Sequence, residues 1–186
     1  MMPYVHWQYF LAIESDLEAT SRFVEFSQKN YATYSIEFAR ILLSCGSEVD
    51  VVAKALCQKI EPLGKYENID NYRPIITGAY KKLSTIEIPL PRYGLAIKPW
   101  EEWNGNSNPS WWKSYNNVKH HRNICFEEAN LENAIRSVGG LFALVLYYYK
   151  DNLSNPDFRW PSFPKLMVIP GSPALVDYGD WQLPDP

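Results

Sequence analysis

Hydrophobic residues recur at helical spacing in the first 60 residues of the chain. In the range 7–28 the apolar side chains follow this spacing roughly, with acidic residues between them and no proline. The range 34–60 repeats the pattern more regularly, and Pro62 and Gly64 come soon after it. Residues at this spacing share one face of an α-helix, and proline and glycine end helices. The pattern therefore predicts two long helices, over 7–28 and 34–60.

Two further helices are predicted in the second half of the chain. The range 104–109 is a cluster of turn-forming residues, and Ser110 after it has the side chain of a helix N-cap. Apolar and aromatic residues then recur at helical spacing over 111–122 and again over 127–150. The pair Gly139-Gly140 lies inside the last segment, where we interpret it as allowing another helix to approach closely.

The segment between these helix pairs has a different character. Residues 62–109 hold six of the fourteen prolines and read as an irregular insertion. A short helix is expected around 72–83. Apolar residues alternate with others over 85–90 and 95–98. This alternation predicts a small β-hairpin, which the prolines confine to an edge.

The C-terminal tail, residues 151–186, is rich in proline and aspartate, and its apolar run 165–169 favours one strand. A chain of 186 residues is long enough for one hydrophobic core and short for two. The expected architecture over 1–186 is a single all-α domain. It has a four-helix up-and-down bundle core, an irregular insertion and an extended C-terminal tail.

Composition narrows the function classes. The formal net charge of −3 argues against an overall electrostatic grip on nucleic acid and leaves room for a local basic patch. The longest apolar stretch, 138–149, is shorter than the roughly 20 residues that span a bilayer. Cys45, Cys57 and Cys125 are odd in number and widely spaced, which disfavours a disulfide framework or a structural zinc site. We expect free thiols and a cytoplasmic protein without membrane contact.

The predicted helix over 111–122 is the most basic segment of the chain. It carries Lys113 and Lys119, Arg122 at its end, and no acidic residue. The aromatic residue Trp112 comes directly before Lys113, and Tyr115 lies between Lys113 and Lys119. Such a mixture can hold a phosphate backbone and stack bases. The alternative is a helix whose aromatic residues belong to the core and whose cations are merely solvated.

Two of the three histidines stand side by side in this helix, at His120 and His121. Asn116 lies four residues before His120, and Asn117 four before His121, so each amide shares a helix face with one imidazole. Histidine titrates near neutrality and is the usual general acid or base. An amide one turn away can fix its tautomer or hold a substrate group. The alternative is one solvated and one buried histidine without chemistry.

The second predicted helix carries acidic residues at the margin of its apolar face. Glu37 and Glu48 lie in a narrow sector there, with Arg40 close by. We expect one of these carboxylates to pair with Arg40, Lys119 or Arg122, and so to support the basic helix. Asp50 and Lys54 are expected to form a separate pair on the outer side.

The sequence favours no metal and no cofactor. A di-iron bundle needs Glu-x-x-His motifs, which do not occur. His120 and His121 would point about 100° apart on a helix, a poor geometry for chelating one ion. Glycine-rich phosphate loops, nucleophile elbows and cysteine pairs are also absent from the sequence.

Two long N-terminal helices, a polar motif that ends in histidine on a third helix, and an apolar fourth helix resemble the HEPN superfamily. The motif of that family is an arginine, a polar residue, three to five further residues and a histidine. The segment Tyr115-Asn116-Asn117-Val118-Lys119-His120 has the polar residue and the histidine at this spacing, with Tyr115 in place of the arginine. The resemblance covers roughly residues 7–61 and 110–150.

The resemblance implies an all-helical, dimeric protein of prokaryotic toxin or defence systems. Many members are metal-independent ribonucleases, in which the histidine assists 2′-hydroxyl activation and the arginine steadies the phosphate. Carried over, His120 takes the acid or base role and Asn116 a positioning role. Arg122 and Lys119 are the cations left for the arginine's role, and we expect both on faces different from the neighbours of Tyr115.

Two functions follow as hypotheses. The first is an RNA-binding protein or metal-independent endoribonuclease with His120 at its centre and a homodimer that joins two motifs. The second is a non-catalytic interaction or regulatory module with a protein partner, in which Trp112 and Tyr115 anchor the interface. A nucleotide-binding bundle is a third reading, supported by the aromatic content alone.

Overall fold

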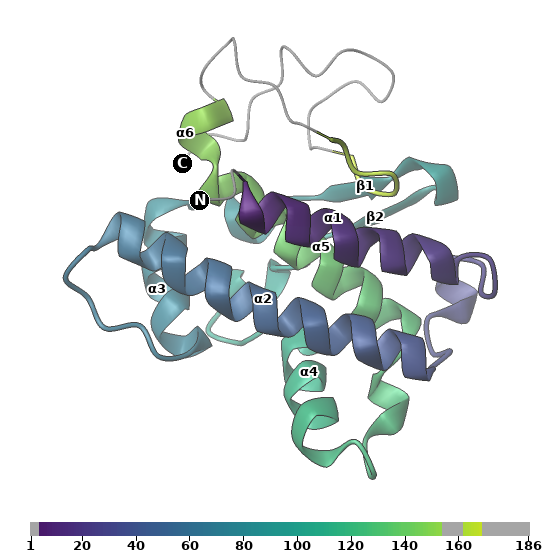
Figure 1. Ribbon diagram of the computed structural model, residues 1–186. Coiled ribbons are helices and arrows are strands. Elements are labelled where there is room, and N and C mark those ends of the chain that lie inside the picture. The colour runs from purple at the N-terminus through teal and green to yellow at the C-terminus, as the bar shows by residue number, and fades with distance from the viewer. Residues whose placement is uncertain (1–3, 154–161, 169–186) are drawn as a thin grey trace.

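The computed structural model describes residues 4–153 and 162–168 (Figure 1). These residues form six α-helices and one two-stranded antiparallel sheet, joined in places by short 3₁₀ turns. In chain order the elements are α1 Val5–Thr20, α2 Ile36–Ile60, α3 Ile69–Ala79, β1 Ile88–Leu90, β2 Leu95–Ile97, α4 Ser110–His121, α5 Leu131–Tyr148 and α6 Lys150–Leu153. The predicted helical class is confirmed, and so is the small hairpin.

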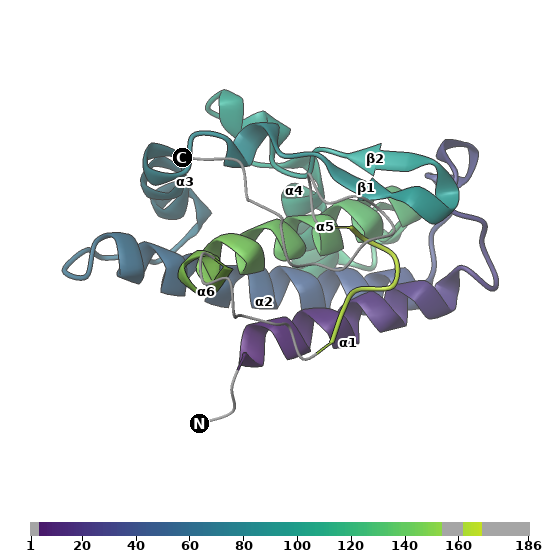
Figure 2. The same cartoon turned by 90° about the horizontal axis from the view of Figure 1, so that it is seen from above.

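Helix α5 is the centre of the packing. It contacts α1, α2 and α4, and Figure 2 shows it between the α1–α2 layer and the β1–β2 hairpin. Every side chain from Leu141 to Tyr147 is buried, as expected for a helix that is apolar on all faces. Arg136, the one cation within α5, is paired with Glu101 and Glu132 at 3.0 Å each. The up-and-down order of the main helices stays a prediction.

The predicted helix over 34–60 is confirmed as α2. Its N-cap is Ser35, whose hydroxyl accepts the backbone N–H of Phe38 at 3.1 Å. The first helix is shorter than predicted, because α1 ends at Thr20 and not near residue 28. Phe23, which the pattern assigned to the core face, is 85% exposed, whereas Phe26 reaches the core from the following loop. The prediction mistook loop aromatics for a continuation of the helix.

The range 62–109 contains the two elements expected in it. The short helix is α3, which starts three residues earlier than predicted, and the hairpin pairs Ile88 with Ile97. The indole of Trp100 donates to the carbonyl of Gly140 at 3.0 Å, which fixes this segment on α5. A Cβ on Gly140 would lie 2.9 Å from the indole of Trp111 on α4, so this glycine does permit a close approach between helices.

Helix α4 starts one residue earlier than predicted. Ser110 is its first residue and not its cap: its backbone N–H donates to Oε1 of Glu102 at 2.9 Å, and no side chain caps the helix at Pro109. The carboxylate of Glu102 thereby satisfies one of the free N–H groups at the helix start. Helix α5 starts at Leu131, four residues later than predicted, after a 3₁₀ turn at 126–128.

Residues 162–168 run along α1 and β1. The carboxylate of Glu14, only 1% exposed, accepts the backbone N–H groups of Lys165, Leu166 and Met167 at 2.8–3.0 Å. The N–H of Val168 donates to the carbonyl of Pro89 at 3.1 Å. The predicted strand over 165–169 does not form in its described part, 165–168, and the rest of that prediction lies outside the described residues. Among the helices that the structure describes, none is long and apolar enough to cross a membrane.

Candidate functional site

Helix α4 has one buried and one exposed face. On the buried face, Trp111, Trp112 and Tyr115 are each at most 7% exposed. This face packs against α2 and α5. The exposed face and the C-terminal end carry the charges Lys113, Lys119, His120, His121 and Arg122. The aromatic residues are therefore core residues, as the alternative interpretation of this helix required. Trp112 and Tyr115 do not form an exposed interface anchor.

Tyr115, which stands where the HEPN motif has arginine, packs against Gly46 of α2. A Cβ on Gly46 would lie 2.3 Å from Cδ2 of the Tyr115 ring, so only glycine leaves room for it. The ammonium group of Lys119 lies 5.5 Å from the centroid of the same ring. Lys119 therefore shares the helix face of Tyr115, against our expectation of a different face. Lys119 is thus a cation beside the position that the motif assigns to arginine.

Asn116 and His120 follow each other one turn apart along α4, and the structure shows no hydrogen bond between them. The amide of Asn116 donates to the carbonyl of Trp112 at 2.9 Å, one turn earlier in the helix. His120 is exposed, and its ring centroid is 6.4 Å from that of His121. Within residues 4–153 and 162–168, no protein group hydrogen-bonds to either imidazole. His120 is thus open to a ligand, but Asn116 does not position it.

Asn117 uses its amide to fix the end of α4. It donates to both carboxylate oxygens of Glu128, at 3.0 and 3.1 Å, in the turn that follows the helix. The same stretch of chain holds Cys125, which is half-buried. The C-terminal end of α4 is therefore anchored, while the side chains of His120, His121 and Arg122 remain exposed.

The acidic residues of α2 do not support α4 as predicted. Oε1 of Glu48 lies 2.6 Å from Nδ1 of His6 on α1. Glu37 forms an exposed i,i+3 pair with Arg40 at 2.7 Å, so that part of the prediction is confirmed. Lys119 and Arg122 receive no carboxylate within the described residues. Glu48 and Arg40 are therefore not part of the site.

The expected pair between Asp50 and Lys54 of α2 does not form, because Asp50 is bonded to α3 instead. Asp50 accepts a hydrogen bond from the hydroxyl of Tyr72 on α3 at 3.2 Å, and the described residues show no ion pair between it and Lys54. Burial, together with the Asp50 charge, raises the pKa of Tyr72 well above its ordinary value, so Tyr72 stays a hydrogen-bond donor.

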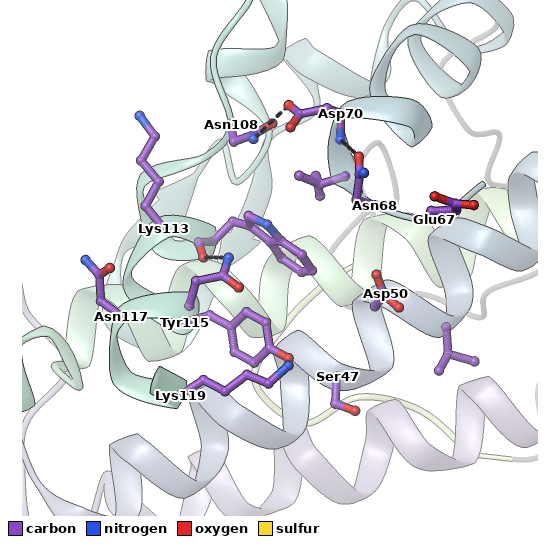
Figure 3. A pocket seen from close by; sticks show the side chains of 14 residues that line it. Ser47, Asp50, Glu67, Asn68, Asp70, Asn108, Lys113, Tyr115, Asn117 and Lys119 are labelled. Carbon is purple, nitrogen blue, oxygen red and sulfur yellow. Dashed lines mark hydrogen bonds between the residues drawn. The ribbon is translucent and has the colours of Figure 1, made fainter. Parts of the chain in front are cut away.

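A pocket of about 670 Å³ opens between α2, the start of α3 and α4. Figure 3 shows Asp50 and Glu67 on one side and Lys113 and Asn117 on the other, with Tyr115 between them. The pocket thus has an acidic wall on α2 and α3 and a basic wall on α4. Its size is typical of sites for small molecules or single nucleotides. Asn116 and Lys119 line it, and His120 is not among its lining residues.

The acidic wall, formed by Asp50, Glu67 and Asp70, was not predicted from the sequence. Asp70 lies in the first turn of α3 and accepts from the amide of Asn108 at 3.1 Å, with Arg73 3.5 Å away. Asn68 before it caps α3. The hydrogen-bonding residues at 68–70 carry the signature of a helix start, which would have predicted α3 but not its position opposite α4.

The cysteines offer no reactive thiol to the site. Cys45 and Cys57 are buried, and burial raises the pKa of both, that of Cys57 to about 12. In the part of the chain that the structure describes, no group of three or more His, Cys, Asp or Glu residues is placed to hold a metal ion.

The cations of α4 have two physical interpretations. Lys119, His120 and His121 occupy its last turn, where the negative end of the helix dipole favours positive charge whatever the function. Of these three residues Lys119 also lines the pocket, which a purely dipolar role would not require. Comparisons with protein-family models, with curated proteins and with solved structures gave no match.

Proposed function

We propose that this protein binds single-stranded RNA through the basic wall of the pocket and the exposed end of α4. The observation that carries the proposal is the joint position of Lys113 and Lys119 on the pocket wall, with His120 and Arg122 exposed beside it. Lysine and arginine side chains neutralise phosphates. The negative net charge of the chain makes binding depend on this local surface.

The proposal includes a HEPN-like arrangement. The contacts α1–α2, α2–α5, α1–α5 and α4–α5 support a four-helix bundle in the up-and-down order of that family. Lys119, next to the ring of Tyr115, replaces the motif's arginine as the phosphate-binding cation. His120 is the candidate general acid or base of a metal-independent ribonuclease, acting in the cytoplasm in a defence or toxin–antitoxin setting. Among the described residues, none forms a hydrogen bond with its ring.

Binding is tested with a fluorescently labelled RNA oligonucleotide in an anisotropy titration at several salt concentrations. We expect Lys119→Ala/Arg122→Ala to weaken binding and to lower the salt slope by about 0.7 for each lost phosphate contact. Lys29→Ala/Lys81→Ala is the matched control, because it removes two exposed cations away from α4. Equal affinities of the two double variants would show that α4 does not bind the RNA.

Catalysis is tested separately by incubating RNA with the protein in EDTA. We expect cleavage by the wild type, loss of cleavage in His120→Ala, and retention in His121→Ala, which removes the neighbouring exposed imidazole. Cleavage by His120→Ala at the wild-type rate, or no cleavage by the wild type, excludes a catalytic His120. RNA binding without cleavage leaves the binding proposal in place.

A second candidate function is a non-catalytic module that associates with a second copy of itself. Ile36 and Ile124 are 69% and 71% exposed. Ile36 is two residues from Tyr34, and Ile124 is two residues from Phe126. The rings of Tyr34 and Phe126 are in contact, with centroids 5.6 Å apart. Exposed apolar groups gathered in this way are typical of an interface. Light scattering should show a dimer that Ile124→Asp dissociates and Leu63→Asp, at a site 99% exposed elsewhere, does not.

A further inference from the structure

The pocket beside α4 has hydrogen-bond acceptors that phosphate binding does not use. Three carboxylates line it, from Asp50, Glu67 and Asp70, and all belong to α2 or to the start of α3. Phosphate would be repelled from this wall, because like charges at close range disfavour each other. If RNA lies along α4, as proposed above, a group other than phosphate must face the carboxylates.

Two of these carboxylates have a free oxygen and no ion pair among the described residues. Asp50 accepts from Tyr72 through Oδ1, and within the described residues its Oδ2 has no hydrogen-bond partner. The carboxylate of Glu67 has no hydrogen bond or ion pair with any described residue. Asp70 differs, since Arg73 lies 3.5 Å from its Oδ1, which also accepts from Asn108. Asp50 and Glu67 are thus the acceptors available to a ligand, and Figure 3 shows them on the same side of the pocket.

A nucleobase fits such a wall only if its edge presents donors. Guanine has two adjacent donors on its Watson–Crick edge, N1–H and the N2 amino group, which match the two oxygens of one carboxylate. Adenine and cytosine place an amino group beside a ring acceptor, and uracil places one N–H between two carbonyls. Proteins read single-stranded RNA on these edges, and hydrogen bonds to a charged acceptor are the stronger ones.

The basic wall on α4, opposite the carboxylates, can face the phosphate of a nucleotide. Lys113 and Lys119 line the pocket on its α4 side, where Figure 3 shows Lys113 extending away from the acidic wall, and Trp112 and Tyr115 lie between the two walls with only small exposed surfaces. A volume of about 670 Å³ accommodates a base with its sugar. We propose that this pocket binds an unpaired guanine of the RNA, with Asp50 or Glu67 accepting from its Watson–Crick edge and the lysines facing its phosphate. This inference rests on the proposed RNA binding.

The test compares uridine-rich oligonucleotides that differ at one central position. That position holds guanosine, inosine or adenosine, and inosine is guanosine without the N2 amino group. We expect the wild type to bind the guanosine oligonucleotide about tenfold more tightly than the other two, the discrimination typical of one two-pronged base contact. Asp50→Asn/Glu67→Gln should lose this preference while still binding RNA, since both changes keep the side-chain shape but replace one acceptor oxygen by an NH₂ donor, which cannot accept from guanine.

Glu87→Gln is the matched control, because Glu87 is an exposed acid away from the pocket lining, and it should keep the preference. Equal wild-type binding of the three oligonucleotides overturns the guanine inference and leaves RNA binding by α4 intact. A preference that persists in Asp50→Asn/Glu67→Gln also overturns it, since another group then reads the base. Absence of binding to all three by the wild type overturns the proposed function together with the inference.

Discussion

Nδ1 of His6 lies 2.6 Å from Oε1 of Glu48 and so joins the start of α1 to the middle of α2. The two side chains are only 14% and 12% exposed. The ring of Tyr148 from α5 meets the His6 imidazole edge-on, with centroids 5.0 Å apart. Glu48, which was expected to pair with Arg40, Lys119 or Arg122, therefore takes part instead in a contact between α1, α2 and α5.

Glu48→Gln should destabilise the fold. The glutamine keeps the shape of the side chain but exchanges a charged acceptor for a neutral one beside the buried His6. Hydrogen bonds to charged groups contribute about 1.5–3 kcal/mol, and we expect a loss at or below the low end of this range in urea unfolding. Glu37→Gln is the control, because its pair with Arg40 is exposed and should contribute under about 1 kcal/mol. Equal losses in both variants would contradict a special role for the His6–Glu48 contact.

Gly46→Ala should also destabilise the fold, through Tyr115. The new Cβ would lie 2.3 Å from Cδ2 of the Tyr115 ring, so the ring or α4 must move. Overpacking of this kind costs about 1–3 kcal/mol, measurable by thermal unfolding. Gly78→Ala is the matched control within a helix: no atom lies within 4 Å of its Cβ, and it should leave stability unchanged or raise it by up to about 1 kcal/mol.

Because Tyr115 and Lys119 belong to the proposed RNA surface, Gly46→Ala gives a second measurement. A shifted ring displaces the neighbouring ammonium group, which lies 5.5 Å from its centroid. RNA affinity should therefore fall in Gly46→Ala and stay unchanged in Gly78→Ala. Unfolding curves that coincide for the two alanine variants would show that the Tyr115 ring moves aside freely.

The sequence predicted correctly those helices that depend on neighbouring residues, through the spacing of apolar positions and the capping residue. Helix α2 was placed to within two residues, because its apolar residues follow a strict period and Ser35 caps it. Helix α1 was extended too far, because Phe23 and Phe26 continue the period although the chain has already left the helix. Periodicity describes which residues are apolar, and only the tertiary packing decides which of them are buried.

The candidate site was predicted on one side only. The exposed cations and histidines of α4 were found from their spacing, and so was the Glu37–Arg40 pair, which is local to one helix. The His6–Glu48 contact joins residues 42 positions apart, and Asp50 meets Tyr72 across two helices. Such pairs depend on how helices pack, which one sequence without packing information does not specify. The acidic wall of the pocket was missed for the same reason.

One cysteine should react faster than the other two in the folded protein. Burial raises the pKa of all three thiols, and the charges of Glu128 and Glu127 raise that of Cys125 further. Accessibility therefore separates them, because Cys125 is half-buried and Cys45 and Cys57 are fully buried. Titration with an aromatic disulfide reagent should modify one thiol per native chain, and all three thiols in denaturant. Cys125→Ser should abolish the fast phase. Two fast thiols in the native protein would show that the α2 core is more open than described.

Glu14 should make stability depend on pH in the direction opposite to most carboxylates. Burial raises the pKa of Glu14 above its ordinary value of 4.5, although the N–H groups of Lys165, Leu166 and Met167 lower it in part. The folded state therefore binds more protons than the unfolded state at pH values between 4.5 and the raised pKa. In this window the contribution of Glu14 to the free energy of unfolding decreases as the pH rises.

Glu14→Gln removes this titration, so the free energy of unfolding of the wild type relative to the variant should increase as the pH falls from 7 towards 4.5. Chemical unfolding at several pH values measures the difference. Asp16→Asn, at an exposed position of the same helix, should show no such change in the window. Because the glutamine NH₂ group would face backbone N–H donors, the amides of Leu166 and Met167 should also lose protection from hydrogen exchange. A wild type that loses stability relative to Glu14→Gln on acidification would mean that the ionised carboxylate is the form the fold prefers.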